Sequence, residues 1–221
     1  MKLALFDLDN TLLPIDSDHG WSQFLINKGV LDRAEFEVRN NQFYADYKAG
    51  TLNITEFLDF QLRPLRDNAL QQLHLWHDEF MQEVIKPNMR ESAIELVKKH
   101  QAEQAVCVMI TATNSFITRP IAEAFGIDVL IATEPELVNN AYTGKVSGLP
   151  SFREGKVSRL NEWLLNNGWT LDSFETSHFY SDSINDLPLL ECVTHPVAAN
   201  PDDTLAQIAK ARGWPVLELF K

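Results

Sequence analysis

The sequence has little cysteine and a deficit of basic residues. It contains two cysteines in 221 residues, Cys107 and Cys192. Two cysteines in a chain of this size are not a disulfide scaffold and have no metal-ligand spacing, so we expect two buried thiols in a reducing compartment. The 19 Lys and Arg face 31 Asp and Glu, a formal net charge of −12. This balance argues against nucleic acid and anionic membranes as main partners, because both attract a basic surface.

The sequence also lacks a long apolar run. No stretch approaches the roughly 20 residues that cross a bilayer. Asp7 and Asp9 interrupt the apolar N-terminus before the core of a signal peptide can form. We therefore expect a cytoplasmic protein. Hydrophobic residues at 45% and charged residues at 23% are ordinary for a globular chain with a buried core.

Short apolar runs alternate with helical patterns along most of the chain. The runs have strand length and lack the alternation of a one-faced sheet, which favours strands buried on both faces. Between them, apolar residues recur every three or four positions. The alternation predicts a doubly wound α/β fold with a parallel sheet. The predicted strands are Leu3–Leu8, Ala105–Ile110, Val129–Ala132, His178–Tyr180 and Pro196–Ala199. The predicted helices are Arg90–His100, Phe116–Phe125 and Lys156–Asn166.

One long segment interrupts this alternation. Residues 15–85 show only helical patterns, with expected breaks at Gly29-Val30, Gly50-Thr51 and Arg63-Pro64. We therefore predict a catalytic core of residues 1–14 plus 86–221 and an inserted all-helical domain of residues 15–85. Residues 139–149 are expected to form a hairpin or loop. The aromatic residues of the insertion are most simply its own core: Tyr44, Tyr47, Phe57, Phe60 and Trp76.

Two acidic motifs follow predicted strands. Asp7 and Asp9 end the first strand, at the edge where open α/β sheets bind ligands. Two carboxyl groups at such a site can divide the work of a nucleophile or metal ligand and a proton carrier, although Asp is also common in turns. Asp182, Asn185 and Asp186 follow another strand. They offer hard oxygen ligands for Mg²⁺, or alternatively the ordinary acidic start of a helix.

Two further residues occupy positions that suit an anion. Thr111 follows a buried strand and precedes a helix, where a hydroxyl and free amides can hold phosphate. Lys156 stands at the start of a helix, where a cation is unfavourable unless an anionic group compensates it.

Taken together and in order, these motifs resemble those of the haloacid dehalogenase superfamily. The resemblance covers essentially the whole chain and is specific to the phosphoserine-phosphatase-like branch, which inserts a helical cap after the first motif. It implies that Asp7 is a nucleophile that accepts a phosphoryl group and that Asp9 is the general acid and base. Because dehalogenases of the superfamily lack this acid, Asp9 argues against carbon–halogen chemistry. The resemblance also implies Mg²⁺ bound by Asp7, the backbone carbonyl of Asp9, and Asp182.

The remaining motif residues receive roles from the same resemblance. Thr111 would donate to a phosphoryl oxygen, Lys156 would balance its charge, and Asn185 would touch the phosphate. Asp186 would orient Lys156 or the waters around the metal. Ser181 and Ser183 stand where the family often has glycine, which makes the loop after that strand less permissive.

The expected substrate is a small phosphorylated metabolite with an amino group. Asp16 stands where phosphoserine phosphatases carry a Glu that holds the substrate ammonium, and Arg63 and Arg66 are candidates for a substrate carboxylate. Because Asp is shorter than Glu, both a phosphoserine-like and a histidinol-phosphate-like substrate stay open. A phosphotransferase with an alcohol acceptor would use the same residues. A non-catalytic binding module is disfavoured by the complete motif set, and a monomer and a homodimer remain equally open.

Overall fold

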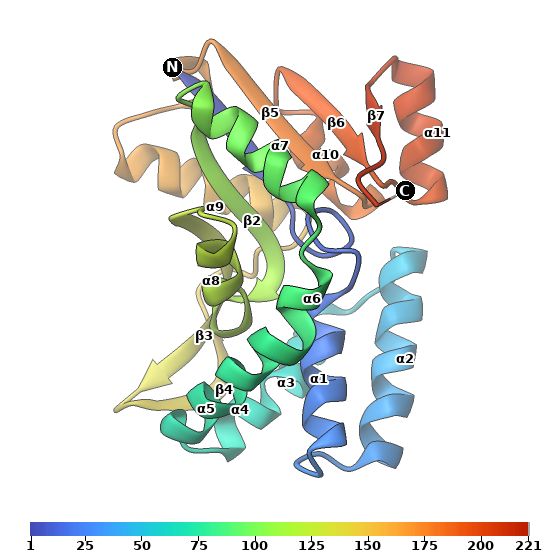
Figure 1. Ribbon diagram of the computed structural model, residues 1–221, viewed down its shortest axis with the longest axis vertical. Helices are drawn as coiled ribbons and strands as arrows, with labels where there is room; N and C mark the ends of the chain where they lie inside the picture. Colours follow the sequence, from blue (N-terminus) through green and yellow to red (C-terminus); the bar gives the residue numbers. More distant parts are fainter. Residues whose placement is uncertain (221) are drawn as a thin grey trace.

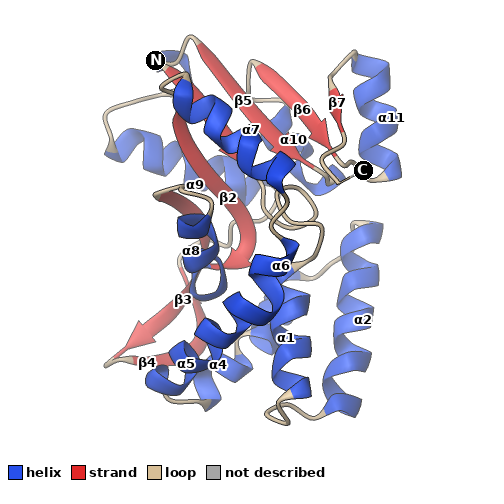
Figure 2. Cartoon of the chain, in the orientation of Figure 1, coloured by secondary structure: helices blue, strands red, loops and turns tan. Residues whose placement is uncertain are grey.

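The core of the protein is a seven-stranded sheet. The computed structural model describes residues 1–220, the side chain of Lys48 excepted. The strands follow the order β4-β3-β2-β1-β5-β6-β7, and every neighbouring pair is parallel except β3 with β4 (Figures 1 and 2). The bounds are β1 Lys2–Phe6, β2 Val106–Asn114, β3 Val129–Val138, β4 Ala141–Ser147, β5 Thr176–Ser181, β6 His195–Ala199 and β7 Val216–Leu217.

Helices cover both faces of this sheet. Along β1, Ala4 and Phe6 belong to one hydrophobic cluster, whereas Leu3 and Leu5 belong to another, as expected of successive side chains on a strand. The first cluster includes residues of α7 (Glu91–Ala102) and α8 (Ser115–Ala124). The second includes residues of α9 (Glu154–Asn166), α10 (Leu187–Leu190) and α11 (Asp203–Arg212). The predicted doubly wound α/β fold is therefore confirmed.

The segment after β1 is helical. Its helices are α1 Ser17–Asn27, α2 Arg33–Ala49, α3 Ile54–Gln61, α4 Arg63–Asp67, α5 Leu70–Phe80, a π-helix Met81–Ile85 and α6 Lys86–Asn88. Helix α2 ends at Gly50, whose φ of 71° suits a residue without a Cβ. Pro64 lies in the first turn of α4, so the Arg63-Pro64 pair starts a helix rather than ending one. The predicted boundary at residue 85 falls within a nearly continuous run of helix and stays a prediction.

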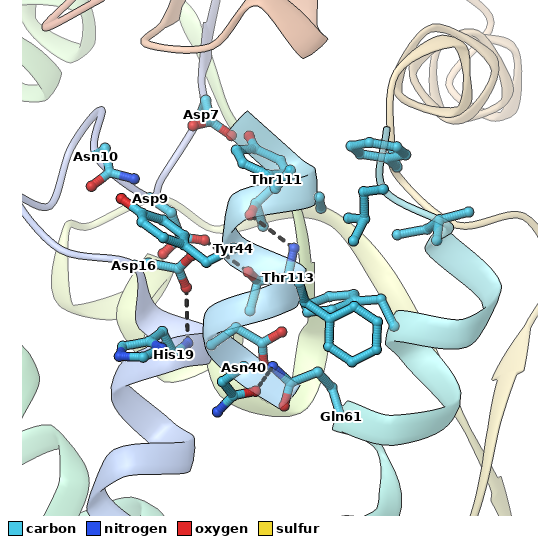
Figure 3. Close-up of a pocket in the computed structure, with 18 of the residues that line it drawn as sticks. Asp7, Asp9, Asn10, Asp16, His19, Asn40, Tyr44, Gln61, Thr111 and Thr113 are labelled. Carbon is cyan, nitrogen blue, oxygen red and sulfur yellow. Dashed lines mark hydrogen bonds between the residues drawn. The ribbon is translucent and has the colours of Figure 1, made fainter. Parts of the chain in front are cut away.

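The helical segment packs most deeply against the sheet through α1 and α5. Trp21 of α1 and Phe80 of α5 are fully buried in the same cluster as Phe6 of the sheet. Helix α4 also packs against β4. By contrast, α2 and α3 contribute Phe36, Phe43 and Phe60 to a small cluster of their own. This part forms the wall opposite the carboxyl ends of β1 and β2 (Figures 1 and 3).

The remaining elements are short. The predicted hairpin at residues 139–149 is present, because β3 and β4 pair in antiparallel fashion around Asn139 and Asn140, which have φ values of 51° and 60°. Two single-turn 3₁₀-helices are Leu171–Ser173 and Ile184–Asp186. The expected burial of both thiols is wrong, because Cys107 is only partly buried and Cys192 is exposed. Within residues 1–220, no helix has the length and apolar character needed to cross a membrane.

We predict that the shared cluster limits the stability of the chain. Phe80→Ala should lower the free energy of unfolding by about 3–5 kcal/mol, because it leaves a cavity between α1, α5 and the sheet. Urea unfolding measures this loss. Leu75→Ala on the same helix is the matched control, because Leu75 is exposed and its truncation should cost less than about 0.5 kcal/mol. Equal losses in the two variants would contradict the packing described.

Candidate active site

A cavity lies between the carboxyl ends of β1 and β2 and the helices α1, α2 and α3 (Figure 3). Asp7, Asp9, Thr111, Lys156 and Asp186 line it from the core side. These five residues come from four separate segments of the sequence. The parallel strands bring their ends to one edge of the sheet, as the sequence predicts.

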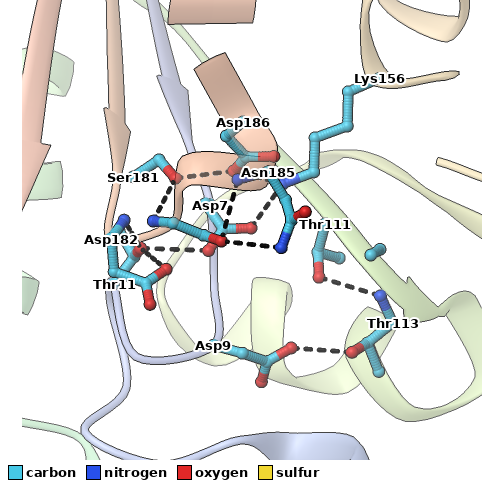
Figure 4. A network of polar contacts seen from close by, with 12 residues as sticks. Asp7, Asp9, Thr11, Thr111, Thr113, Lys156, Ser181, Asp182, Asn185 and Asp186 are labelled. Atoms are coloured by element: carbon cyan, nitrogen blue, oxygen red, sulfur yellow. Dashed lines mark hydrogen bonds and ion pairs between the residues drawn. The ribbon is translucent and has the colours of Figure 1, made fainter. Parts of the chain in front are cut away.

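Asp7 and Asp186 share one lysine. The Nζ atom of Lys156 lies 2.7 Å from Oδ1 of Asp7 and 2.7 Å from Oδ2 of Asp186 (Figure 4). Only 2% of Lys156 is exposed. Ser181 of β5 donates a further hydrogen bond of 2.7 Å to Oδ2 of Asp186. Asp186 thus holds the ammonium group against Asp7, and the cation at a helix start is explained by its two anionic partners.

The approach of Lys156 depends on its neighbour Gly155. A Cβ atom at Gly155 would lie 2.1 Å from the backbone oxygen of Pro150, a distance that no side chain tolerates. Glycine therefore allows the preceding loop to pack directly against the first turn of α9. This contact places Lys156 at the cavity rather than in solvent.

Thr11 connects two carboxyl groups that come from different strands. Its Oγ1 atom lies 3.0 Å from Oδ2 of Asp7 and 3.2 Å from Oδ1 of Asp182, and it accepts a hydrogen bond of 3.0 Å from the Asp182 amide (Figure 4). The hydroxyl has one proton and serves one carboxylate at a time. Oδ2 of Asp7 and Oδ1 of Asp182 therefore share a single hydroxyl proton, that of Thr11.

These oxygens fit the ligand preference of Mg²⁺. The ion takes one or two carboxylates and completes its octahedron with waters, carbonyls or phosphate oxygens. Within the described residues, no group of three or more His, Cys, Asp or Glu side chains is placed to hold a metal ion. Asp182 also borders a neighbouring hollow that Asn10, Tyr44 and Tyr47 line.

Asp9 is oriented by two donors. The hydroxyl of Thr113 donates to Oδ2 over 2.7 Å (Figure 4). The amide of Ser17 donates to Oδ1 over 2.6 Å. One donor belongs to β2 and the other to the first turn of α1. The carboxyl group of Asp9 is thus held at the junction of the core and the helical segment. It does not contact Lys156.

Burial and mutual repulsion raise the pKa values of these acids. Burial, with the charges of Asp186 and Asp9, raises the pKa of Asp7 to about 7 against the opposing effect of Lys156. Burial and the charge of Asp16 raise the pKa of Asp9 to about 6. Burial and the charge of Asp7 raise the pKa of Asp182 well above its usual range. Burial opposes the charge on Lys156, but Asp186 and Asp7 outweigh it and raise the pKa of the ammonium group.

Thr111 and Asn185 occupy different surroundings. Thr111 lies at the cavity, and its hydroxyl accepts a hydrogen bond of 3.2 Å from the amide of Thr113. Asn185 is turned toward the helical segment, where its amide nitrogen donates to the carbonyl of Tyr47 over 3.1 Å. Its amide oxygen accepts from Nε of Arg153 over 3.0 Å. The structure therefore does not bring Asn185 to the cavity lining.

Arg153 is a residue that the sequence reasoning missed. It precedes α9 with a φ of 52°, an uncommon value for a residue with a side chain. Its guanidinium group also donates to the carbonyl of Gly50 at the end of α2. Arg153 and Asn185 together tie the C-terminal end of α2 to the core. No sequence motif marks this role. By contrast, the hydroxyl groups of Thr11 and Thr113 could have been found, because each stands two residues after a motif residue, Asp9 or Thr111.

The wall from the helical segment differs from the one expected. Tyr47 and Phe57 pack against the small cluster of α2 and α3, as expected of cap core, but they also line the cavity. Tyr44 lines the cavity and is exposed, so its interpretation as cap core is wrong. Phe60 is buried as expected, and Trp76 packs against the main cluster. Helices α2 and α3 each turn one face toward the cavity and another toward the neighbouring helix. Residue type alone does not distinguish these two faces.

The acidic and basic candidates of the segment separate in space. Asp16 lines the cavity and accepts a hydrogen bond of 2.9 Å from the amide of His19 at the start of α1 (Figure 3). Asp18 lines it too. Arg63 instead lies 2.7 Å from Glu35, and Arg66 lies 2.7 Å from Asp67. Both arginines are exposed at these ion pairs, and within the described residues no arginine lines the cavity.

The fold and this set of motif residues define a hydrolase class. The sequence pattern described as haloacid dehalogenase-like hydrolase matches residues 4–191. The chain belongs to this family of hydrolases and is a phosphatase.

Individual relatives agree with this assignment. The chain is 49% identical over 217 residues to a histidinol-phosphatase of Neisseria meningitidis serogroup C, covering 98% of each chain. It is 50% identical to a protein of unknown function from Bordetella pertussis Tohama I, whose solved structure matches 99% of each chain with a TM-score of 0.94. A phosphoserine phosphatase structure with a phospho-aspartyl intermediate analogue is 19% identical, with 100% and 93% coverage and a TM-score of 0.69, and shares the fold.

We predict that the raised pKa of Asp7 makes the metal-free protein less stable as the pH rises. Asp7 titrates near 3.8 as an ordinary group and at about 7 in the folded state, so between these values the folded state keeps a proton that the unfolded chain loses. The contribution of Asp7 to the free energy of unfolding is complete below about pH 4 and is lost as the pH rises through about 7.

Urea unfolding in EDTA at about pH 5 and about pH 8 measures this effect. Between the two conditions, wild type should lose on the order of 2 kcal/mol more stability than Asp7→Asn, which cannot ionise there. Asp172→Asn on the surface should behave like wild type. Parallel losses in wild type and Asp7→Asn would contradict the raised pKa.

Proposed function

We propose that this phosphatase is a Mg²⁺-dependent phosphomonoesterase that hydrolyses an amino-bearing phosphate such as histidinol phosphate through an aspartyl-phosphate on Asp7. The observation that carries the proposal is that two carboxyl groups at one cavity have different partners. Asp7 forms an ion pair with Lys156, whereas Asp9 accepts a hydrogen bond from Thr113. Two carboxyl groups in different surroundings at one cavity suit a nucleophile and a proton carrier.

In the first step, a carboxylate oxygen of Asp7 attacks phosphorus. A bond forms between this oxygen and phosphorus, and the bond from phosphorus to the substrate alkoxide breaks. Lys156, at 2.7 Å from Asp7, orients the nucleophile and balances negative charge on the phosphoryl oxygens. Thr111 supports the same oxygens from the end of β2 with its hydroxyl.

Asp9 supplies the proton that the leaving alkoxide needs. Its pKa of about 6 makes the carboxylic acid available near neutral pH. Once it has given its proton, the Asp9 carboxylate accepts one from the water that attacks the phosphorus of aspartyl-phosphate. That attack breaks the bond between phosphorus and the Asp7 oxygen and releases inorganic phosphate. Thr113 and the Ser17 amide keep Asp9 in position for both transfers.

Asp7, Asp182 and the backbone carbonyl of Asp9 would hold Mg²⁺, and the convergence of Asp7 and Asp182 on Thr11 supports this assignment. When bound, the ion supplies positive charge that neutralises phosphoryl oxygens and favours in-line attack. Lys156 alone cannot balance the carboxyl groups around it, because Asp7 and Asp186 already share its charge.

The lining of the cavity supports an amine without a carboxylate. Asp16 and Asp18 place two acidic groups beside the leaving-group side of the cavity, and Arg63 and Arg66 lie elsewhere. Asp16 would bind the substrate ammonium. Histidinol phosphate combines an ammonium group with an imidazole and has no carboxylate, which agrees with the name of the Neisseria relative.

We predict a strong preference for this charge pattern. With Mg²⁺, kcat/KM for L-histidinol phosphate should exceed that for L-phosphoserine by about 100-fold or more, because a buried carboxylate beside Asp16 and Asp18 meets like charge. Phosphate release across these two substrates and glucose 6-phosphate measures the preference. A higher kcat/KM for phosphoserine or for glucose 6-phosphate than for histidinol phosphate would overturn the proposed substrate.

We predict that Asp9→Asn separates the two chemical steps. The leaving group of p-nitrophenyl phosphate departs without a proton, so the variant should still form aspartyl-phosphate. Hydrolysis of this intermediate should slow by about 10²–10⁴-fold without the base. Stopped-flow kinetics should show a burst of nitrophenol close to one equivalent, followed by slow turnover.

Asp7→Asn is the paired variant for this experiment. It should give neither burst nor turnover, because it removes the atom that accepts the phosphoryl group. Asp172→Asn, on the surface, should retain the wild-type course. A burst that persists in Asp7→Asn would place the nucleophile on another residue.

A further inference from the structure

The cavity wall contains two buried polar atoms that the proposed chemistry does not use. Within the described residues, Oδ1 of Asp18 and Nδ2 of Asn40 have no hydrogen-bond partner. The two residues are only 5% and 3% exposed, and both line the cavity. An unpaired buried acceptor or donor costs on the order of 1–3 kcal/mol. Such a pair at a cavity indicates groups that a ligand satisfies.

The orientation of Asn40 is fixed by its neighbours. Ser22 of α1 donates to Oε1 of Gln61 over 3.0 Å. Nε2 of Gln61 in turn donates to Oδ1 of Asn40 over 3.1 Å (Figure 3). This relay occupies the oxygen of the Asn40 amide and leaves its nitrogen as the free group. Asn40 therefore presents a donor, and Asp18 presents an acceptor.

Aromatic side chains line the same cavity as these two atoms. The rings of Phe43 and Phe57 meet edge to face at 5.4 Å, and Tyr47 lies 6.2 Å from Phe152 across the junction with the core. All four residues line the cavity. A flat ring packs well against such walls. The wall thus combines a surface for a ring with one donor and one acceptor.

We propose that Asp18 and Asn40 recognise the imidazole ring of the substrate and determine specificity for it. Asp18 accepts the ring N–H, and Asn40 donates to the other ring nitrogen. The assignment rests on the proposed function and extends it, because Asp16 binds the ammonium group while Asp18 and Asn40 bind the ring. A neutral imidazole offers one donor and one acceptor, which match the two unpaired atoms.

Other groups satisfy this wall less completely. A second ammonium group would meet Asp18 and leave the donor of Asn40 unpaired. A carboxylate would meet Asn40 and repel Asp18. A phenyl ring would fill the aromatic slot and leave both atoms unpaired, a loss that sites built for hydrogen bonding penalise strongly. The imidazole is the ring that pairs both.

The experiment compares two substrates that differ in the ring alone, L-histidinol phosphate and L-phenylalaninol phosphate. We measure kcat/KM for both with Mg²⁺ in wild type, Asp18→Asn and Asn40→Leu. Asn41→Leu on the same helix and Asp59→Asn on α3 are matched controls, because both residues are exposed and lie outside the cavity. Thermal unfolding verifies that each variant folds, and Asn40→Ser replaces Asn40→Leu if the latter does not.

We expect wild type to prefer histidinol phosphate, and each cavity variant to reduce this preference about tenfold or more, mainly through KM. The two controls should keep the wild-type preference. If wild type hydrolyses histidinol phosphate efficiently but the cavity variants leave the preference unchanged, the ring assignment is wrong and the proposed function stands. If wild type hydrolyses neither amine phosphate while hydrolysing other phosphates, both proposals fail.

Discussion

The constraint on which the site depends is an excess of buried negative charge around one cation. Asp7 and Asp186 share Lys156, Asp182 meets Asp7 through Thr11, and Asp9 stands beside them. A single ammonium group cannot neutralise several carboxyl groups in a poorly hydrated pocket, so their pKa values rise. In the proposed function, a divalent cation and a phosphoryl group would change this balance together.

The fold maintains this unfavourable arrangement with rigid supports. The acids stand at the ends of buried parallel strands, and Gly155 allows α9 to bring Lys156 against them. The helical segment adds an opposing wall that shares the main hydrophobic cluster through α1 and α5. Arg153 and Asn185 fasten the end of α2 to the core, so catalytic groups and substrate-facing groups keep one geometry.

Much of this could be predicted from the sequence, and the exceptions have a physical reason. Buried strands produce continuous apolar runs, and the acids directly after them must meet at one sheet edge, so Asp7, Asp9 and Asp182 could be located. Within the helical segment, no comparable sequence pattern shows in which direction a side chain points. Arg63 and Arg66 carry the charge that a substrate carboxylate needs, but both pair with acids at the surface. The role proposed for Asn40 depends on hydrogen bonds among three residues that are distant in sequence.

The measurement that tests the central claim most directly is Mg²⁺ binding by calorimetry in buffers of different ionisation enthalpy. Near neutral pH, wild type should bind one ion per chain and release protons, because acids with raised pKa values must ionise to become ligands. Asp182→Asn should weaken binding by about tenfold or more. Binding without proton release, or binding that is indifferent to Asp182→Asn, would contradict the account.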